Sequence, residues 1–178
     1  MYKFSKSISL ILILILFQFG FSQEEKIITK MDRFVSNTGS IIKLENYYMP
    51  ELKGYSTVAK VQVRKATSAD DVGFFLQIIK EDKYGNKSAS IAEEDLIEVI
   101  KAYDELVIQS NSEDTNADYF ENKFTTEDGF QIGYGGGKDR LWFLILEKFG
   151  KSTVLFQGHE SIGTALKDGL KKIESLKL

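Results

Sequence analysis

Two stretches of this chain are apolar on both faces, and they constrain its fold more than any other feature. Val72 to Ile79 (VGFFLQII) is bounded by acidic pairs, and residues 141–146 (LWFLIL) lie between an arginine and a glutamate. Both runs are too short for a buried helix and have the length and composition of central strands covered on each side. The sequence therefore predicts sheets whose inner strands are covered by further layers.

Residues 57–65 predict a strand of a different kind, with one face in a core and the other in water. Ala59, Val61 and Val63 alternate with Lys60, Gln62 and Arg64. This period of two is typical of a half-exposed strand. Further strands are expected at 41–52, 88–91, 119–124, 130–134 and 153–156, with turns at 84–87 and 127–129.

Two helices are expected, at residues 93–109 and 160–176. Their apolar residues fall at helical spacing, and acidic residues occupy the first turn of the earlier helix, where the helix dipole favours negative charge. The apolar positions are Leu96, Val99, Ile100, Tyr103 and Val107 in the first, and Ile162, Ala165, Leu166, Leu170 and Ile173 in the second. Residues 23–40 fit either a short helix or a loose lead-in.

The two halves of the chain resemble each other. Phe75-Leu76 with Lys80 matches Phe143-Leu144 with Lys148, and the apolar residues of the two expected helices share their mutual spacing. The sequence thus predicts an α+β fold of antiparallel sheets with two helices, built from a duplicated unit of three or four strands and one helix. The repeats would span residues 37–110 and 117–178.

This order of four strands and one helix resembles the repeat of the PUR-alpha and PC4-like single-strand-binding proteins. The resemblance is one of topology, and no residue motif of those families is matched here. The resemblance implies their fold but not their function. Those proteins bind nucleic acid on a basic, aromatic sheet face, whereas this chain has a net negative charge.

The N-terminus has the anatomy of a secretory signal peptide. Lys3 and Lys6 precede an unbroken apolar run from Leu10 to Phe17, and small residues stand at the positions expected before cleavage at Gln23. The run is shorter than the roughly 20 residues of a membrane-spanning helix, which favours cleavage over anchoring. We expect a signal peptide at 1–22, one mature domain at 23–178 with no integral membrane segment, and export to the periplasm or the extracellular space.

Charge and cysteine content exclude several classes of partner. Residues 1–22 carry two lysines and no acid, so the net charge of −3 for the chain becomes −5 for residues 23–178, which argues against nucleic acid. The absence of cysteine excludes disulfides, thiolate metal sites and a cysteine nucleophile. The expected partner is an unknown protein or small ligand.

The sequence predicts no catalytic residue, metal ligand or cofactor. His159 is the only histidine and no G-x-S-x-G elbow accompanies it, so a solvent-exposed position at the start of a helix is expected. Asp114 to Asp118 imitates the opening of a calcium loop but lacks its glycine and its final glutamate.

The candidate binding residues are Tyr134, Lys138 and Arg140, in a glycine-rich segment (YGGGKDR) interpreted as a hairpin loop. A tyrosine with two cations at a loop tip could meet an anionic group on a partner. The sequence favours a non-catalytic binding or structural domain. Two alternatives stay open: an envelope hydrolase using paired carboxylates, and a carrier of small apolar ligands.

Overall fold

The computed structural model describes residues 28–178 except positions 37, 70, 84, 113–115, 138 and 149–151. The expected signal peptide at 1–22 and the candidate residue Lys138 lie outside the described residues. Within them, the chain forms two four-stranded antiparallel sheets and three helices, which confirms the predicted α+β fold. No described helix is long and apolar enough to cross a membrane.

The first sheet has the strand order β1-β2-β3-β4, and all neighbours are antiparallel. Its strands are β1 (Ile42–Lys53), β2 (Val58–Ser68), β3 (Asp71–Lys80) and β4 (Lys87–Ala92). The run predicted to be a covered central strand is β3, where Phe75, Leu76 and Ile78 are buried. The two faces of this strand therefore belong to different layers.

The second sheet repeats this arrangement in the order β5-β6-β7-β8. Its strands are β5 (Phe120–Thr125), β6 (Gln131–Gly136), β7 (Arg140–Ile145) and β8 (Thr153–Phe156). The other doubly apolar run forms β7, and its Trp142, Phe143 and Leu144 are buried. Gly129 takes the positive φ of 88° in the β5–β6 turn, as the turn sequence predicts.

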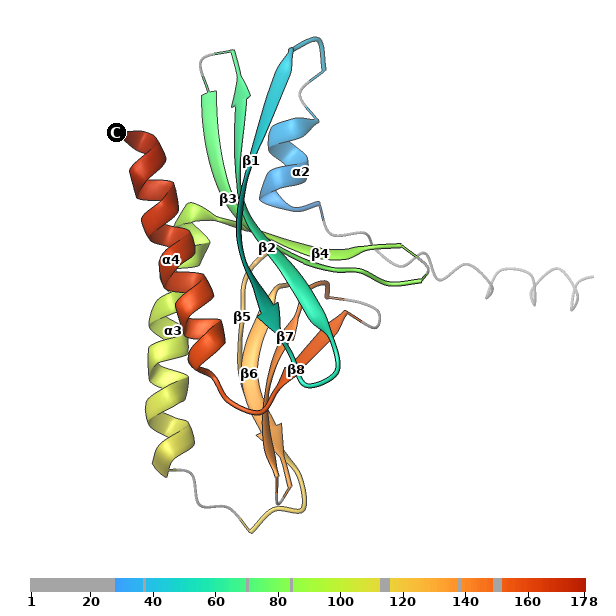
Figure 1. Ribbon diagram of the computed structural model, residues 1–178, viewed down its shortest axis with the longest axis vertical. Coiled ribbons are helices and arrows are strands. Elements are labelled where there is room, and N and C mark those ends of the chain that lie inside the picture. The colour runs from blue at the N-terminus through green and yellow to red at the C-terminus, as the bar shows by residue number, and fades with distance from the viewer. Residues whose placement is uncertain are drawn as a thin grey trace, which may run out of the picture.

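A long helix follows each sheet, and the two helices lie side by side on one side of the molecule (Figure 1). They are α3 (Glu93–Ser112) and α4 (Glu160–Lys177). One contiguous hydrophobic cluster joins them to both sheets; Leu96 and Val99 come from α3, and Ile162 and Ile173 from α4. All four of these side chains are fully buried, as the helical spacing predicts.

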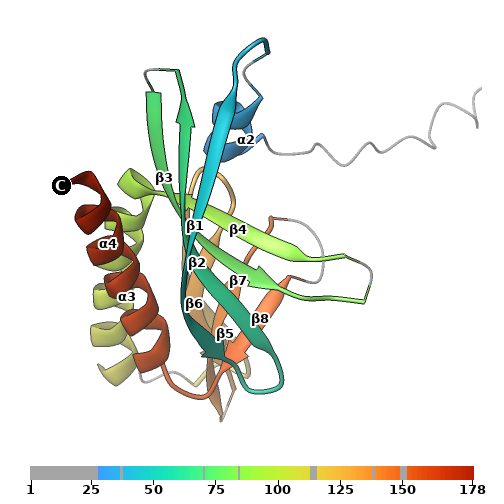
Figure 2. The same cartoon turned by 45° about the horizontal axis from the view of Figure 1, so that its top comes forward.

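The third helix, α2 (Lys30–Val35), lies on the other side of the first sheet from α4 (Figure 2). Thr29 caps it: the Thr29 hydroxyl accepts from the Asp32 amide at 3.0 Å, and the Asp32 carboxylate accepts from the Thr29 amide at 3.1 Å. Residues 30–35 are thus a short helix, one of the two readings that the sequence allowed. Met31 and Phe34 pack there against Ala66, Phe75 and Ala92 in a second, smaller hydrophobic cluster.

Candidate binding face on the first sheet

The first sheet has one face in the main core and one face turned away from it. Cross-strand register places Asn46, Arg64 and Phe75 in one row, and Tyr48, Gln62 and Gln77 in the next row. We call the face that bears these two rows the outer face. It is the water-facing side of β2 that the alternation of residues 57–65 predicts, so the sequence itself places Arg64 there.

Arg64 is the most unusual residue of the outer face. Its side chain is half-buried, and its Nε donates a 2.8 Å hydrogen bond to Asn46 Oδ1 across the β1–β2 pair. Among the described residues, no carboxylate forms an ion pair with this guanidinium, whereas the neighbouring Lys60 is paired with Glu81. Burial lowers the pKa of Arg64, and only the Tyr48 phenol opposes that shift. Arg64 is therefore a partly desolvated positive charge without an ion-pair partner in the described part of the chain.

Two apolar side chains of β1 stand beside the Asn46–Arg64 row. Tyr48 is 83 % exposed and Leu44 is 46 % exposed, and alternation along the strand puts both on the same face as Asn46. An exposed tyrosine offers a rigid amphipathic surface to a partner at low entropic cost. The charge of Arg64 on β2 therefore shares the outer face with the Asn46 amide and with Leu44 and Tyr48 on β1.

Beside the exposed Tyr48, its row continues across β2 and β3 with two buried glutamines. Gln62 Nε2 donates to Gln77 Oε1 at 2.7 Å, and Gln77 Nε2 lies 2.8 Å from Ser90 Oγ and 3.3 Å from Met31 Sδ. Both glutamines are about 5 % exposed or less. Because their amides are engaged with each other and with neighbouring strands, this part of the outer face is held rigidly.

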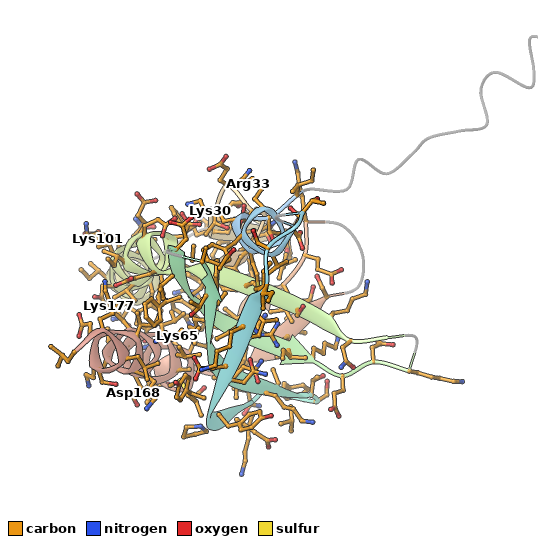
Figure 3. The ribbon with its side chains drawn as sticks, turned by 90° about the horizontal axis from the view of Figure 1, so that it is seen from above. Lys30, Arg33, Lys65, Lys101, Asp168 and Lys177 are labelled. Carbon is orange, nitrogen blue, oxygen red and sulfur yellow. The ribbon has the colours of Figure 1, made fainter. Side chains whose placement is uncertain are left out.

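Helix α2 covers the part of the outer face formed by β3 and β4. Ion pairs and hydrogen bonds to carboxylates anchor it there. Lys30 pairs with Asp95 at 2.5 Å and with Glu94 at 3.1 Å, and the Lys30 amide donates to Asp128 Oδ2 at 2.8 Å. Burial alone would lower the pKa of Lys30, but its hydrogen bonds to the two carboxylates raise it overall. In Figure 3, Lys30 and Arg33 lie on α2, apart from Asp168 and Lys177 on α4. The carboxylates that meet here thus hold α2 in place.

Of the candidate residues named from the sequence, the structure describes Tyr134 and Arg140, and neither is an exposed residue. Tyr134 is fully buried beside Trp142, and its hydroxyl accepts from Asn122 Nδ2 at 2.8 Å. Arg140 donates from Nη1 to the Ser110 carbonyl and lies over the Phe120 ring, 5.6 Å from the ring centroid. The aromatic surface expected at a loop tip is therefore inside the core, because strand β6 extends through Tyr134 to Gly136. A role for Tyr134, Lys138 or Arg140 in binding stays a prediction.

Gly135 and Gly136 of this segment belong to strand β6, as does Gly133 just before it, whereas Gly137 lies in the connection to β7. A Cβ at Gly135 would lie 2.6 Å from the Phe120 carbonyl oxygen, and one at Gly133 would overlap the Asn122 carbonyl oxygen. Gly136 has a φ of 133°, which favours glycine. The antiparallel strands β6 and β7 pair as far as Gly136 and Arg140, so the run does form a hairpin, but its loop is confined to residues 137–139. Close approach of β5 to β6 explains Gly133 and Gly135.

His159 is not the exposed residue that the sequence suggests. Its ring centroid lies 5.2 Å from that of Trp142, and its Nδ1 is 2.8 Å from Tyr103 Oη. Burial, with like-charge effects from nearby acids, raises the pKa of the Tyr103 phenol. The Tyr103 hydroxyl also lies 3.2 Å from the His159 carbonyl oxygen, so the pair joins α3 to the start of α4. The geometry is that of a packing contact between two helices.

The described residues also include a small cavity beside α4. A cavity of about 220 Å³ between β1 and α4 is lined by Met49, Pro50 and Leu52 with Ala165, and it is smaller than the roughly 300 Å³ typical of ligand pockets. No group of three or more acidic or histidine side chains among the described residues is placed to hold a metal ion.

Arg64 was not predicted as a binding residue from the sequence, because its lack of a described ion-pair partner depends on which residues surround it in space.

No protein-family model matches this chain, and no curated protein sequence matches it at a significant level.

Proposed function

We propose that this protein is an exported, non-catalytic binding domain that engages a partner protein through the outer face of its first sheet. Arg64 carries the proposal. Its guanidinium is half-buried and bonds to the neutral Asn46 side chain, and an anionic group on a partner would supply the ion pair that no described carboxylate makes. Export is proposed from the signal anatomy of residues 1–22.

The surroundings of Arg64 support a protein partner over a small ligand. Arg64 lies on a sheet face beside the protruding Tyr48, and an arginine next to an exposed tyrosine is a frequent centre of protein interfaces. The rigid glutamine row beside them lowers the entropic cost of binding. Arg64 would bind the anion of the partner, and Tyr48 would supply the apolar contact.

Capture from the envelope fraction of the source organism tests this function. Immobilised mature protein is compared with the Arg64→Gln and Tyr48→Ala variants, and with Lys171→Gln as a control that removes one exposed charge on α4. We expect the first two variants to lose most of the captured partner and the control to retain it. Equal capture by all four proteins would contradict the assignment of the outer face.

We also propose that the chain arose by duplication. In each half, four antiparallel strands precede one helix, and the two Phe-Leu pairs lie at the third strand of their sheets, Phe75-Leu76 in β3 and Phe143-Leu144 in β7. In this view only the first half developed the binding face, because the second carries no equivalent of Arg64.

A further inference from the structure

The edge of β1 offers unpaired backbone next to Arg64. β1 is the first strand of its sheet, and no described strand pairs with its other side. The regular part of this edge runs from Ile42 to Met49, where a register shift at Pro50 interrupts it. An edge of this length presents free amide and carbonyl groups to an added strand.

Over residues 42–48, the edge strand carries its charged side chains on one face only. On the outer face β1 presents Ile42, Leu44, Asn46 and Tyr48, none of them charged. Lys43 and Glu45 point to the opposite face and pair with each other at 3.0 Å. On the outer face, therefore, no charged side chain of residues 42–48 opposes the addition of a strand to this edge.

Arg64 is aimed across β1 toward this edge. Its Nε bonds to Asn46 on the edge strand, so its side chain already spans the distance between β2 and β1. A strand added beside β1 would place a side chain in the same row about 10 Å from the Cβ of Arg64. An arginine and a glutamate that extend toward each other cover such a distance.

We propose that the edge of β1 binds an extended acidic segment of a partner protein by strand addition, with a carboxylate in the Asn46 row bound by Arg64. This inference rests on the proposed function and specifies its partner. A second copy of the chain fits less well, because the regular part of its own β1, residues 42–49, has no carboxylate on the outer face.

The neighbours of Asn46 define the rest of the segment. Leu44 and Tyr48 lie two residues to either side of Asn46, on the same face. An added strand would meet them with its residues two before and two after the acid. The preferred segment therefore has apolar residues at those two positions around a central Glu or Asp.

Synthetic peptides of designed sequence test the inference directly. The acidic probe is Thr-Val-Thr-Glu-Thr-Val-Thr, and the matched control has Gln at the centre. Titration into ¹⁵N-labelled mature protein, followed by amide chemical shifts, gives both the affinity and the site. We expect the acidic probe to shift amides of residues 42–49 and to bind about tenfold more tightly than the Gln peptide.

Variants of the protein complete the test. Arg64→Gln should bind both peptides equally weakly, while Lys171→Gln should behave as the natural protein does. Arg64→Glu should bind a peptide with a central Lys better than the acidic probe. Because the peptide pair is compared on the unmodified protein, the test holds even if an Arg64 variant folds poorly.

Several results would overturn the inference. It fails if the acidic probe does not bind at millimolar concentration, if Glu and Gln peptides bind alike, or if the shifts lie away from β1. It also fails if the mature protein alone is a dimer with protected β1 amides, since a second copy would then occupy the edge. If capture from the envelope fraction still depends on Arg64 in those cases, strand addition is wrong but the proposed binding face is retained.

Discussion

Gly163 of α4 allows a direct test of the helix pair, because two physical effects predict opposite results for Gly163→Ala. Alanine is favoured over glycine inside a helix by roughly 1 kcal/mol, so propensity alone predicts that the variant is more stable. A Cβ at Gly163 would, however, overlap the phenol of Tyr103, which α3 presses against this point. The relative size of the two effects decides the outcome.

The structure indicates that the overlap is the larger effect. Tyr103 is 5 % exposed, is held by His159 at 2.8 Å and packs beside Trp142, with ring centroids 6.0 Å apart, so its ring has little room to move. Overpacking in such a core costs about 1–3 kcal/mol. Loss of the Tyr103–His159 hydrogen bond adds about 1 kcal/mol. After the gain in propensity is subtracted, we expect Gly163→Ala to lower the free energy of unfolding by about 1–3 kcal/mol.

Urea titration followed by tryptophan fluorescence measures this change, because the only tryptophan, Trp142, lies beside Tyr103. Thr164→Ala is the matched control: Thr164 is the next residue of the same helix, and its exposed hydroxyl bonds only to the Glu160 carbonyl within the helix. The control should change stability by no more than about 0.5 kcal/mol. An increase in stability of about 1 kcal/mol in Gly163→Ala would show that α3 and α4 do not meet as described.

Three further predictions follow from burial, charge and the N-terminal sequence. Leu166→Ala should lower the free energy of unfolding by about 2–5 kcal/mol, and Ile100→Ala by less, because Leu166 is 1 % exposed and Ile100 is half-buried; equal losses in urea titrations would contradict this. Burial raises the pKa of Asp128, so the folded state gains stability relative to an Asp128→Asn variant as the pH falls through that raised pKa, and loses it as the pH rises; urea titrations of both proteins at neutral pH and near pH 4.5 should show this, and a pH-independent difference would refute it. N-terminal sequencing of the exported protein should begin at or near Gln23, and an intact Met1 would exclude cleavage.

The strands and helices could be predicted from the sequence because each has a strong local pattern. The expected run of 72–79 became β3, and the expected helix of 160–176 became α4, with boundaries that differ by one residue. In both, apolar spacing identifies side chains that are buried, such as Leu76 in β3 and Leu166 in α4. The exceptions are in β3, where Val72 is exposed and the polar Gln77 is buried, because their burial depends on the layers that cover each part of the strand.

The candidate site could not be predicted in the same way. The glycines near Tyr134 suggest a loop locally, but Gly133 and Gly135 are required because the backbone of β5 approaches β6, a contact between different strands. The exposure of Tyr48 and the missing counter-charge of Arg64 likewise depend on neighbours from other strands. Alternation places Arg64 on the solvent-facing side of β2. The sequence contains no signal, however, that no described carboxylate forms an ion pair with its guanidinium.

The hydrogen bond from the Lys30 amide to Asp128 joins residues 98 positions apart in the chain. A chain made from its N-terminus produces the residues of α2 long before it produces their anchor. At about 5–20 residues per second, that interval lasts roughly 5–20 s. During it Met31 and Phe34 lack the Asp128 contact that fixes the start of their helix. The apolar contacts of α2 and its ion pair with Asp95 use residues made earlier, so a chain that stops before residue 128 would keep those contacts and lack the hydrogen bond to Asp128 at the start of the helix.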